Sequence, residues 1–166
     1  MEHSISSAFT TPSQSVPPYS EPGDVDLNKV LEQALTAAYN IIEPQRIIIR
    51  CDRLPVLQGN QPHFDKLFDH IMQLVLSEPS AGNRQFLYVR CEEEEMDKED
   101  LPVSGHNKTY IIQFHSNIIL DAYWQIAYQP ILSDCEQIAK TYGGSFTYTQ
   151  LNSGSLFTLR LAGKPL

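Results

Sequence analysis

Helix-like and strand-like segments follow one another along this chain in an order that few folds accommodate. Apolar residues recur at helical spacing in three segments, and runs rich in β-branched and aromatic residues indicate strands. In chain order the predicted elements are a helix from Asp24 to Pro44, a strand at 46–51, a helix from Pro62 to Pro79, strands at 85–92 and 109–116, a helix at 133–142, and strands at 145–151 and 155–161. The order predicts an α+β fold, a two-layer sandwich with three helices on one face of a mixed, mostly antiparallel β-sheet.

A Ser-, Thr- and Pro-rich stretch precedes this pattern. Residues 1–23 show no periodicity and hold too little apolar surface to offset the entropy of ordering them, so we predict a flexible tail. A docking peptide is the functional alternative for this stretch. We place one folded domain at 24–162, followed by a short tail at 163–166.

The charge balance excludes several classes of partner. The chain has 12 Lys and Arg against 20 Asp and Glu, which gives a formal net charge of −8. Binding to nucleic acid and to anionic membranes depends on Lys and Arg at the contact surface, so we expect neither partner. No apolar run reaches the roughly 18 residues that span a bilayer, and we expect no membrane insertion.

The cysteines and the amino-terminal segment indicate the compartment. Cys51, Cys91 and Cys135 lie far apart and show no CxxC spacing, which indicates reduced thiols and not a disulfide framework or a zinc site. The first residues have neither the basic n-region nor the apolar h-region of a secretory signal. We therefore expect a cytoplasmic protein.

Motifs of common catalytic sites are absent, and we predict no catalytic residue and no metal ligand. The chain has no GxGxxG, Walker A, HExxH or GxSxG pattern, and no histidine pairs with another His or Cys at ligand spacing. His70 lies beside apolar helix positions, which favours a partly buried, hydrogen-bonded structural role. For Trp124, Tyr123 and Tyr128 we favour core packing over a binding patch. The acidic run at 92–100 favours a solvated hairpin loop over an interaction surface.

Read together, the segments resemble the ATP-binding domain of sensor histidine kinases, the GHKL-type ATPase fold. VDLNKVLEQALTAAYNII is similar to the first helix of the family, and RIIIRCDRLPVLQGNQPHFDKLFDHIMQLVL to its strand, LP-x-V-x-x-G-D connection and second helix. EQIAKTYGGSFTYTQLNSGSLFTLRL is similar to its last helix and closing hairpin. The resemblance spans roughly residues 24–161 and implies a histidine-kinase-like ATPase fold in bacterial two-component signalling.

The residues that give the family its activity do not match. The resemblance places Leu74 where an Asn holds magnesium, and a leucine side chain has no oxygen to coordinate that metal. It places Ser116 at the Asp that binds adenine, and Ile118 and Leu120 at the two glycines of the same motif. Glycine lets the backbone approach phosphate, whereas a branched side chain occupies that space. We therefore expect no cofactor, and in particular no ATP or magnesium.

Two further parts of a kinase are missing from the pattern. The second glycine motif of the family falls near Gln129 and Ile131, and only eight residues separate Leu120 from Gln129, so the lid that closes over ATP is shortened or absent. No histidine stands in the phosphoacceptor context of the family, which is His followed by an acidic and then an apolar residue.

These observations lead to one hypothesis and two alternatives. The first is a degenerate ATPase-like domain that does not bind nucleotide and acts as a protein-interaction module, with a receiver domain or a sensor kinase as partner. Its former pocket would be filled by Leu74, Ile118, Leu120 and either Trp124 or Ile131. The second is a divergent but functional ATP-binding kinase or ATPase domain in which His70, Ser116 and Asn117 contact the nucleotide. The third is a phosphotransfer scaffold that uses its own histidine, His63 or His70.

Overall fold

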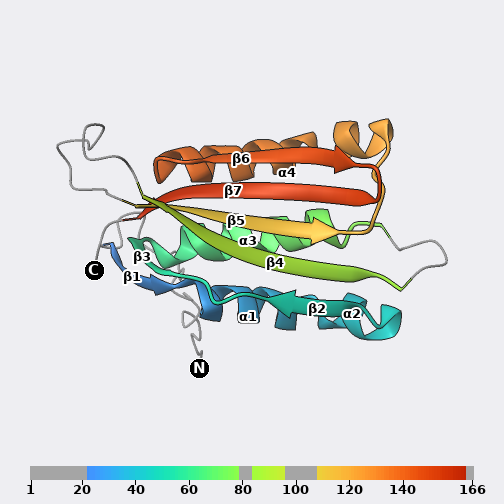
Figure 1. Ribbon diagram of the computed structural model, residues 1–166, viewed down its shortest axis with the longest axis horizontal. Helices are drawn as coiled ribbons and strands as arrows, with labels where there is room; N and C mark the ends of the chain where they lie inside the picture. The colour runs from blue at the N-terminus through green and yellow to red at the C-terminus, as the bar shows by residue number, and fades with distance from the viewer. Residues whose placement is uncertain (1–21, 79–83, 96–107, 164–166) are drawn as a thin grey trace, which may run out of the picture.

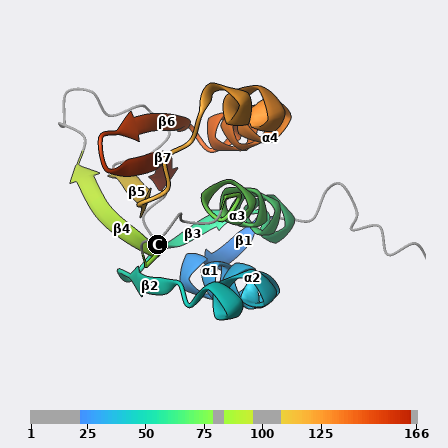
Figure 2. The same ribbon diagram turned by 90° about the vertical axis from the view of Figure 1, so that its right-hand side faces the viewer.

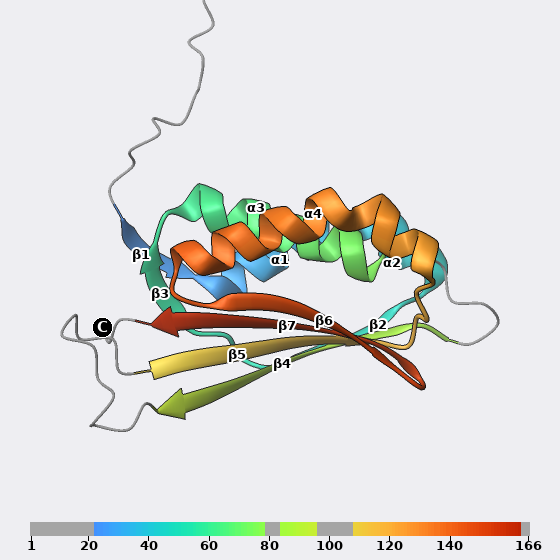
Figure 3. The same cartoon turned by 90° about the horizontal axis from the view of Figure 1, so that it is seen from above.

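The computed structural model is a two-layer α+β sandwich, and it describes residues 22–78, 84–95 and 108–163. One layer is a five-stranded β-sheet, and the helices pack together on one of its two faces (Figures 1 and 3). The fold class predicted from the order of the segments is confirmed.

The described residues form seven strands and four helices. The strands are β1 (Gly23–Asp26), β2 (Ile48–Cys51), β3 (Val56–Gly59), β4 (Phe86–Glu95), β5 (Lys108–Ser116), β6 (Ser145–Leu151) and β7 (Gly154–Gly163). The helices are α1 (Leu27–Ala37), α2 (Tyr39–Gln45), α3 (Gln61–Val75) and α4 (Ala122–Thr141).

The main sheet has the strand order β2-β4-β5-β7-β6. β2 pairs with β4 in parallel, and the other neighbours are antiparallel, so the sheet is mixed and mostly antiparallel as predicted. The turn at Asn152 and Ser153 joins β6 to β7 as a hairpin. β1 and β3 form a separate antiparallel pair at one end of the domain.

The core lies between the helical layer and the sheet. α3 is the central helix, and its buried residues follow the helical period that the sequence shows. Phe68 of α3 meets Phe114 of β5 edge to face, with 5.9 Å between the ring centroids. Burying a side chain of this size stabilises the fold by about 1.5–3 kcal/mol, so this helix is a main source of stability.

The predicted first helix is wrong in detail. The structure has two helices there, because the chain leaves helical geometry at Ala38 (φ −91°, ψ 7°). Pro44 does not end the segment, since α2 continues through it to Gln45 and stops at Arg46, whose φ of 51° is left-handed. Residues 54–60, which the sequence suggests are a connection, contain the strand β3. This strand forms by pairing with β1.

Two further predictions need correction. The last helix is twice as long as the predicted 133–142, because it starts at Ala122 and passes through Pro130. Glu92–Glu95 are not loop residues, since they continue β4 and pair with β5. The rest of the acidic run at 92–100, and the predicted tails 1–23 and 163–166 except for Pro22, Gly23 and Gly163, lie outside the described residues. No helix in the described part is long and apolar enough to cross a membrane.

Candidate functional site

The candidate site is the region where α3, the connection 117–121 and the first turns of α4 meet. β5 ends at Ser116 and α4 begins at Ala122, so five residues join the sheet to the helix. In the end view, α3 and α4 lie side by side on the sheet, with α1 and α2 beyond α3 (Figure 2). The chain therefore passes directly from the central strand into a helix that covers the sheet.

The aliphatic and aromatic side chains that these elements contribute are buried. Leu74 of α3 is completely buried, and Ile118, Leu120 and Trp124 are each less than one-tenth exposed. They belong to the same apolar cluster as the rest of the core. The four side chains expected from the sequence to fill the former pocket, including Trp124, are thus all buried in the core. Ile131 is only half-buried against the same cluster.

Trp124 is held by polar and aromatic contacts. Its indole N–H donates to the Ser77 hydroxyl over 2.6 Å, and that hydroxyl donates to the Leu74 carbonyl over 2.8 Å. The indole stacks on Tyr128, with 5.1 Å between centroids, and contacts Phe157 of β7 at 5.8 Å. Asp121 caps α4 by accepting the Trp124 backbone N–H over 2.9 Å. The ring is therefore fixed in both position and orientation.

The polar residues proposed as nucleotide contacts have structural hydrogen bonds. The buried Ser116 hydroxyl accepts the Ile118 N–H over 3.2 Å. The Asn117 side chain accepts the Phe86 N–H over 3.1 Å and donates to the Arg84 carbonyl over 3.0 Å, which attaches the connection to the start of β4. These side chains bind backbone groups after the end of β5 and at the start of β4. The side-chain oxygen and nitrogen of Asn117 each already have a hydrogen-bond partner.

His70 lies elsewhere on α3 and faces α4. Its Nε2 atom is 3.5 Å from a carboxylate oxygen of Asp134, and the ring is 18% exposed. Within the described residues neither ring nitrogen makes a hydrogen bond, so the partly buried position is as predicted and the hydrogen bond is not. The structure brings Ser116 and Asn117 together at the end of β5 and directs His70 toward a different partner.

The start of β7 lies very close to the backbone at the end of β5, where the connection begins. Gly154, at the start of β7, lies so near the Ser116 carbonyl that an added Cβ would be 2.0 Å from its oxygen. Gln150 of β6 accepts the Leu120 N–H over 3.3 Å and donates to the Gly154 carbonyl over 2.8 Å. The hairpin thus holds the connection from the sheet side.

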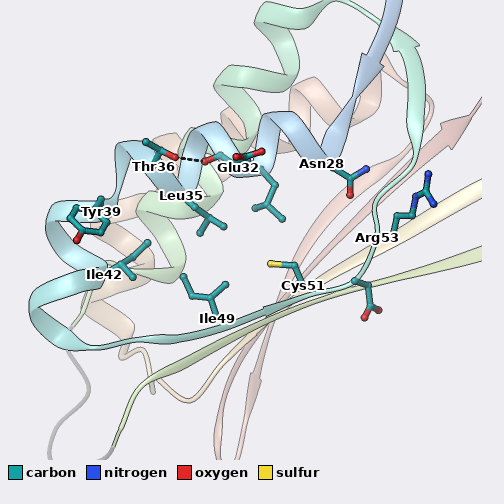
Figure 4. A pocket seen from close by; sticks show the side chains of 11 residues that line it. Asn28, Glu32, Leu35, Thr36, Tyr39, Ile42, Ile49, Cys51 and Arg53 are labelled. Carbon is teal, nitrogen blue, oxygen red and sulfur yellow. Dashed lines mark hydrogen bonds between the residues drawn. The ribbon is translucent and has the colours of Figure 1, made fainter.

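Metal binding has no support among the described residues, where no three His, Cys, Asp or Glu side chains gather. A separate hollow of about 620 Å³ lies between α1, α2 and β2 (Figure 4). Leu35, Ile42 and Ile49 give it apolar walls, and Thr36 donates to the Glu32 carbonyl at its rim. Burial raises the pKa of the Cys51 thiol beside it, which keeps that group neutral at neutral pH.

The likeness to known proteins lies in the fold. No protein-family model matches the sequence, and no curated protein matches it. Solved structures do match. The histidine kinase AdeS of Acinetobacter baumannii superposes with a TM-score of 0.64 at 14% identity, over 87% of this chain and 68% of that chain. The chain has the fold of a histidine kinase catalytic domain.

Two further histidine kinases support this assignment. The ATP binding domain of PrrB from Mycobacterium tuberculosis gives a TM-score of 0.58 at 16% identity, over 88% of this chain and all of that domain. The histidine kinase ThkA, in its complex with the response regulator protein TrrA, gives 0.60 at 12% identity, over 87% of this chain and 42% of ThkA. At these identities the likeness establishes the fold.

Sequence reasoning missed two features of this site. The first is the hydrogen bond from Trp124 to Ser77. These residues are 47 positions apart in the sequence, so no local pattern predicts the bond. The second feature is the cap at Asp121, which does have a local signal, because Asp is a preferred residue at the position just before a helix. The core packing favoured for Trp124 is confirmed, whereas Tyr123 points to solvent.

Proposed function

We propose that this protein is a degenerate histidine-kinase-like ATPase domain that does not bind ATP and acts as a protein-interaction module in bacterial two-component-type signalling. The observation that carries the proposal is the burial of Ile118, Leu120 and Trp124 in and just after the connection 117–121, with Trp124 hydrogen-bonded to Ser77 at the end of α3. A phosphate-binding site needs bare backbone and oxygen ligands, and these side chains provide neither.

The polar groups nearby support the same conclusion. Magnesium takes oxygen ligands, and Leu74 offers none from α3. The oxygen atoms of Ser77, Ser116 and Asn117 already have hydrogen-bond partners within the protein. ATP and magnesium therefore do not fit the residues present, and we derive no chemical step through them.

The partner class is proposed by analogy with a solved complex of the same fold. ThkA, whose catalytic domain has this fold, forms a complex with the response regulator TrrA. We propose a receiver domain or a sensor kinase as the partner of this chain, in the cytoplasm. An acidic net charge of −8 favours a basic contact surface on that partner.

The sole tryptophan of the chain makes the first test direct. In this proposal Trp124 lies in the place that the family resemblance assigns to the nucleotide, so its fluorescence is expected to report on a nucleotide that enters there. We expect no change in emission and no change in Tm when ATP and magnesium are titrated to millimolar concentration. The ATP binding domain of PrrB serves as the positive control. Saturable binding at micromolar ATP would contradict the proposal and favour the divergent ATPase.

The partner is tested by biolayer interferometry. The immobilised protein is presented with the purified receiver domains and sensor-kinase catalytic cores of its source organism. We expect saturable binding of one or a few of these proteins, weakened by salt because charge contributes. Absence of binding across the complete set would contradict the interaction role.

A further inference from the structure

The main sheet has an open edge at β2. This strand is the last in the order β2-β4-β5-β7-β6, and it pairs with β4 alone. The N–H groups of Ile48 and Asp52 donate to backbone carbonyls on the β4 side over 2.9 and 2.8 Å. Because successive backbone groups of a strand point to opposite edges, the N–H and C=O groups of Ile49 and Cys51 point away from β4. No hydrogen bond to these groups occurs within the described residues.

The open stretch is bounded at both ends. Before it, the Ile47 N–H donates to the Ile42 carbonyl of α2 over 3.2 Å. After it, the side chain of Asn28 in α1 accepts the Leu54 N–H over 2.7 Å and donates to the Leu54 carbonyl over 2.8 Å. The helical layer thus satisfies the backbone on either side and leaves residues 49–51 with an unpaired edge.

The hollow of about 620 Å³ lies beside this stretch, between β2 and the helices α1 and α2 (Figure 4). Ile49 and Cys51 are in register with Leu87 and Val89, which are buried under the helical layer, so their side chains point to the helices and line the hollow. Leu35 of α1 forms part of the opposite wall. The same two residues therefore offer unpaired backbone groups at the edge and side chains in the hollow.

A strand added at this edge would place alternate side chains in the hollow. Residues in register on neighbouring strands have their side chains on the same face of a sheet. The residues of an added segment in register with Ile49 and Cys51 therefore point into the hollow, toward Leu35 and Ile42. The residue between them lies on the other face, beside Arg50. An apolar side chain fits the first and third of these positions, whichever direction the segment runs.

The edge is basic, although the chain has a net charge of −8. The segment 46–53 has one acidic residue, Asp52, and three exposed arginines, Arg46, Arg50 and Arg53. With Glu32 on the opposite wall of the hollow counted, three arginines still outnumber two carboxylates. Acidic residues in an added segment complement this charge. Two copies of the chain that met edge to edge would bring the arginines together, which disfavours a second copy as the occupant.

We propose that the free edge of β2 binds an extended acidic segment of another protein as a sixth strand of the sheet. Backbone hydrogen bonds to Ile49 and Cys51 hold the segment, the hollow takes apolar side chains at alternate positions, and Arg50 favours an acidic residue between them. The site lies apart from the region around Trp124. It therefore depends neither on the absence of ATP binding nor on the partner class proposed above.

Fluorescence anisotropy with a synthetic peptide tests the site. The probe is a fluorescein-labelled peptide of eight residues in which valine alternates with aspartate. We expect saturable binding that weakens about tenfold or more when lysine replaces aspartate. Equal binding of the lysine peptide would overturn the acidic occupant. Absence of binding up to millimolar peptide would overturn the site, and the role proposed above would stand, since it is tested with whole receiver and kinase proteins.

Methylated peptides test the strand pairing. Methyl groups on the valine nitrogens remove the hydrogen bonds of an antiparallel strand, and methyl groups on the aspartate nitrogens remove those of a parallel strand. We expect one of the two methylated peptides to bind about tenfold or more weakly, because each lost hydrogen bond weakens binding several-fold. Equal binding of the methylated and unmethylated peptides would overturn strand addition and favour a ligand held by the hollow alone.

Variants of the edge give a second test. Cys51→Pro removes an N–H that points away from β4, and Cys51→Ala is the matched control that keeps it. We expect peptide binding to fall about fivefold or more for the proline variant and to stay unchanged for the alanine variant. Arg50→Glu should also weaken binding, whereas Lys140→Glu, at an exposed residue of α4, should not. Equal binding by both members of each pair would overturn the proposal. The methylated peptides decide the question if the proline variant does not fold.

Discussion

The indole N–H of Trp124 donates to the Ser77 hydroxyl over 2.6 Å, and this bond ties α4 to the end of α3. Since the Ser77 hydroxyl also donates to the Leu74 carbonyl, the indole is linked to the backbone of α3. One polar contact thus orients the largest side chain of the candidate site.

Removing Ser77 is predicted to destabilise the domain through this bond. Ser77→Ala leaves the indole N–H without a partner in an apolar setting, and we expect a loss of about 1–3 kcal/mol in the free energy of unfolding. Urea unfolding followed by circular dichroism measures it. The double variant with Trp124→Phe should lose less than the sum of the two single variants. Additive losses would show that the contact contributes nothing to stability.

Gly154 is predicted to be intolerant of a side chain. Gly154→Ala places a methyl group against the Ser116 carbonyl, and we expect a loss of about 2–3 kcal/mol because the hairpin must move away from β5. Gly23→Ala is the control, since nothing lies within 4 Å of the added carbon there. Thermal unfolding compares the two variants, and similar Tm values would contradict the packing described for the connection.

Stability is predicted to fall in alkaline solution. Burial, with Asp134 adding to it, raises the pKa of the Cys135 thiol to about 12, and burial with Glu93 and Asp52 raises that of Cys91 to about 11. An unfolded thiol titrates near 8.5, so above that pH the unfolded state loses protons that the folded state keeps. Stability therefore decreases as pH rises from about 8.5. Urea midpoints across this range should fall less steeply for Cys135→Ala, and an unchanged slope would exclude the thiol as the cause.

Acid is predicted to weaken the start of α1. Asp26 caps this helix by accepting the side-chain and backbone N–H groups of Asn28, which hold the pKa of its carboxyl below the ordinary value. The contribution of this carboxylate to the free energy of unfolding is present at neutral pH. It is lost as pH falls below about 4, because the unfolded state then binds the proton more readily than the folded state. Asp26→Asn should flatten this acid limb in urea titrations, whereas Asp24→Asn, at a residue with no cap bond in the described part, should not.

The sequence predicts the fold wherever a segment carries its own period. α3 shows seven buried residues at helical spacing after Pro62, and the hairpin at Asn152 is marked by turn residues between two alternating strands. These signals are local, so they are visible without the tertiary structure. The α+β architecture follows from them, and the burial of Leu74, Ile118 and Leu120 agrees with the expectation drawn from the family resemblance.

The errors arise where tertiary contacts override local pattern. The first half of α4 is apolar on its outer face as well as its inner face, so no amphipathic period separates Trp124 from Tyr123 and Ile126. Pro130 also argues against a helix in the sequence, because proline disfavours helix interiors. In the structure α4 continues through it while packing on the core. β3 forms only because β1 lies beside it, and no period in its four residues indicates that pairing.

The connection 117–121 has a last consequence. It is short and fastened at both ends, by Asn117 to the start of β4 and by Asp121 to the first turn of α4. In the proposed role, such a segment presents the same surface to a partner whatever the energy charge of the cell.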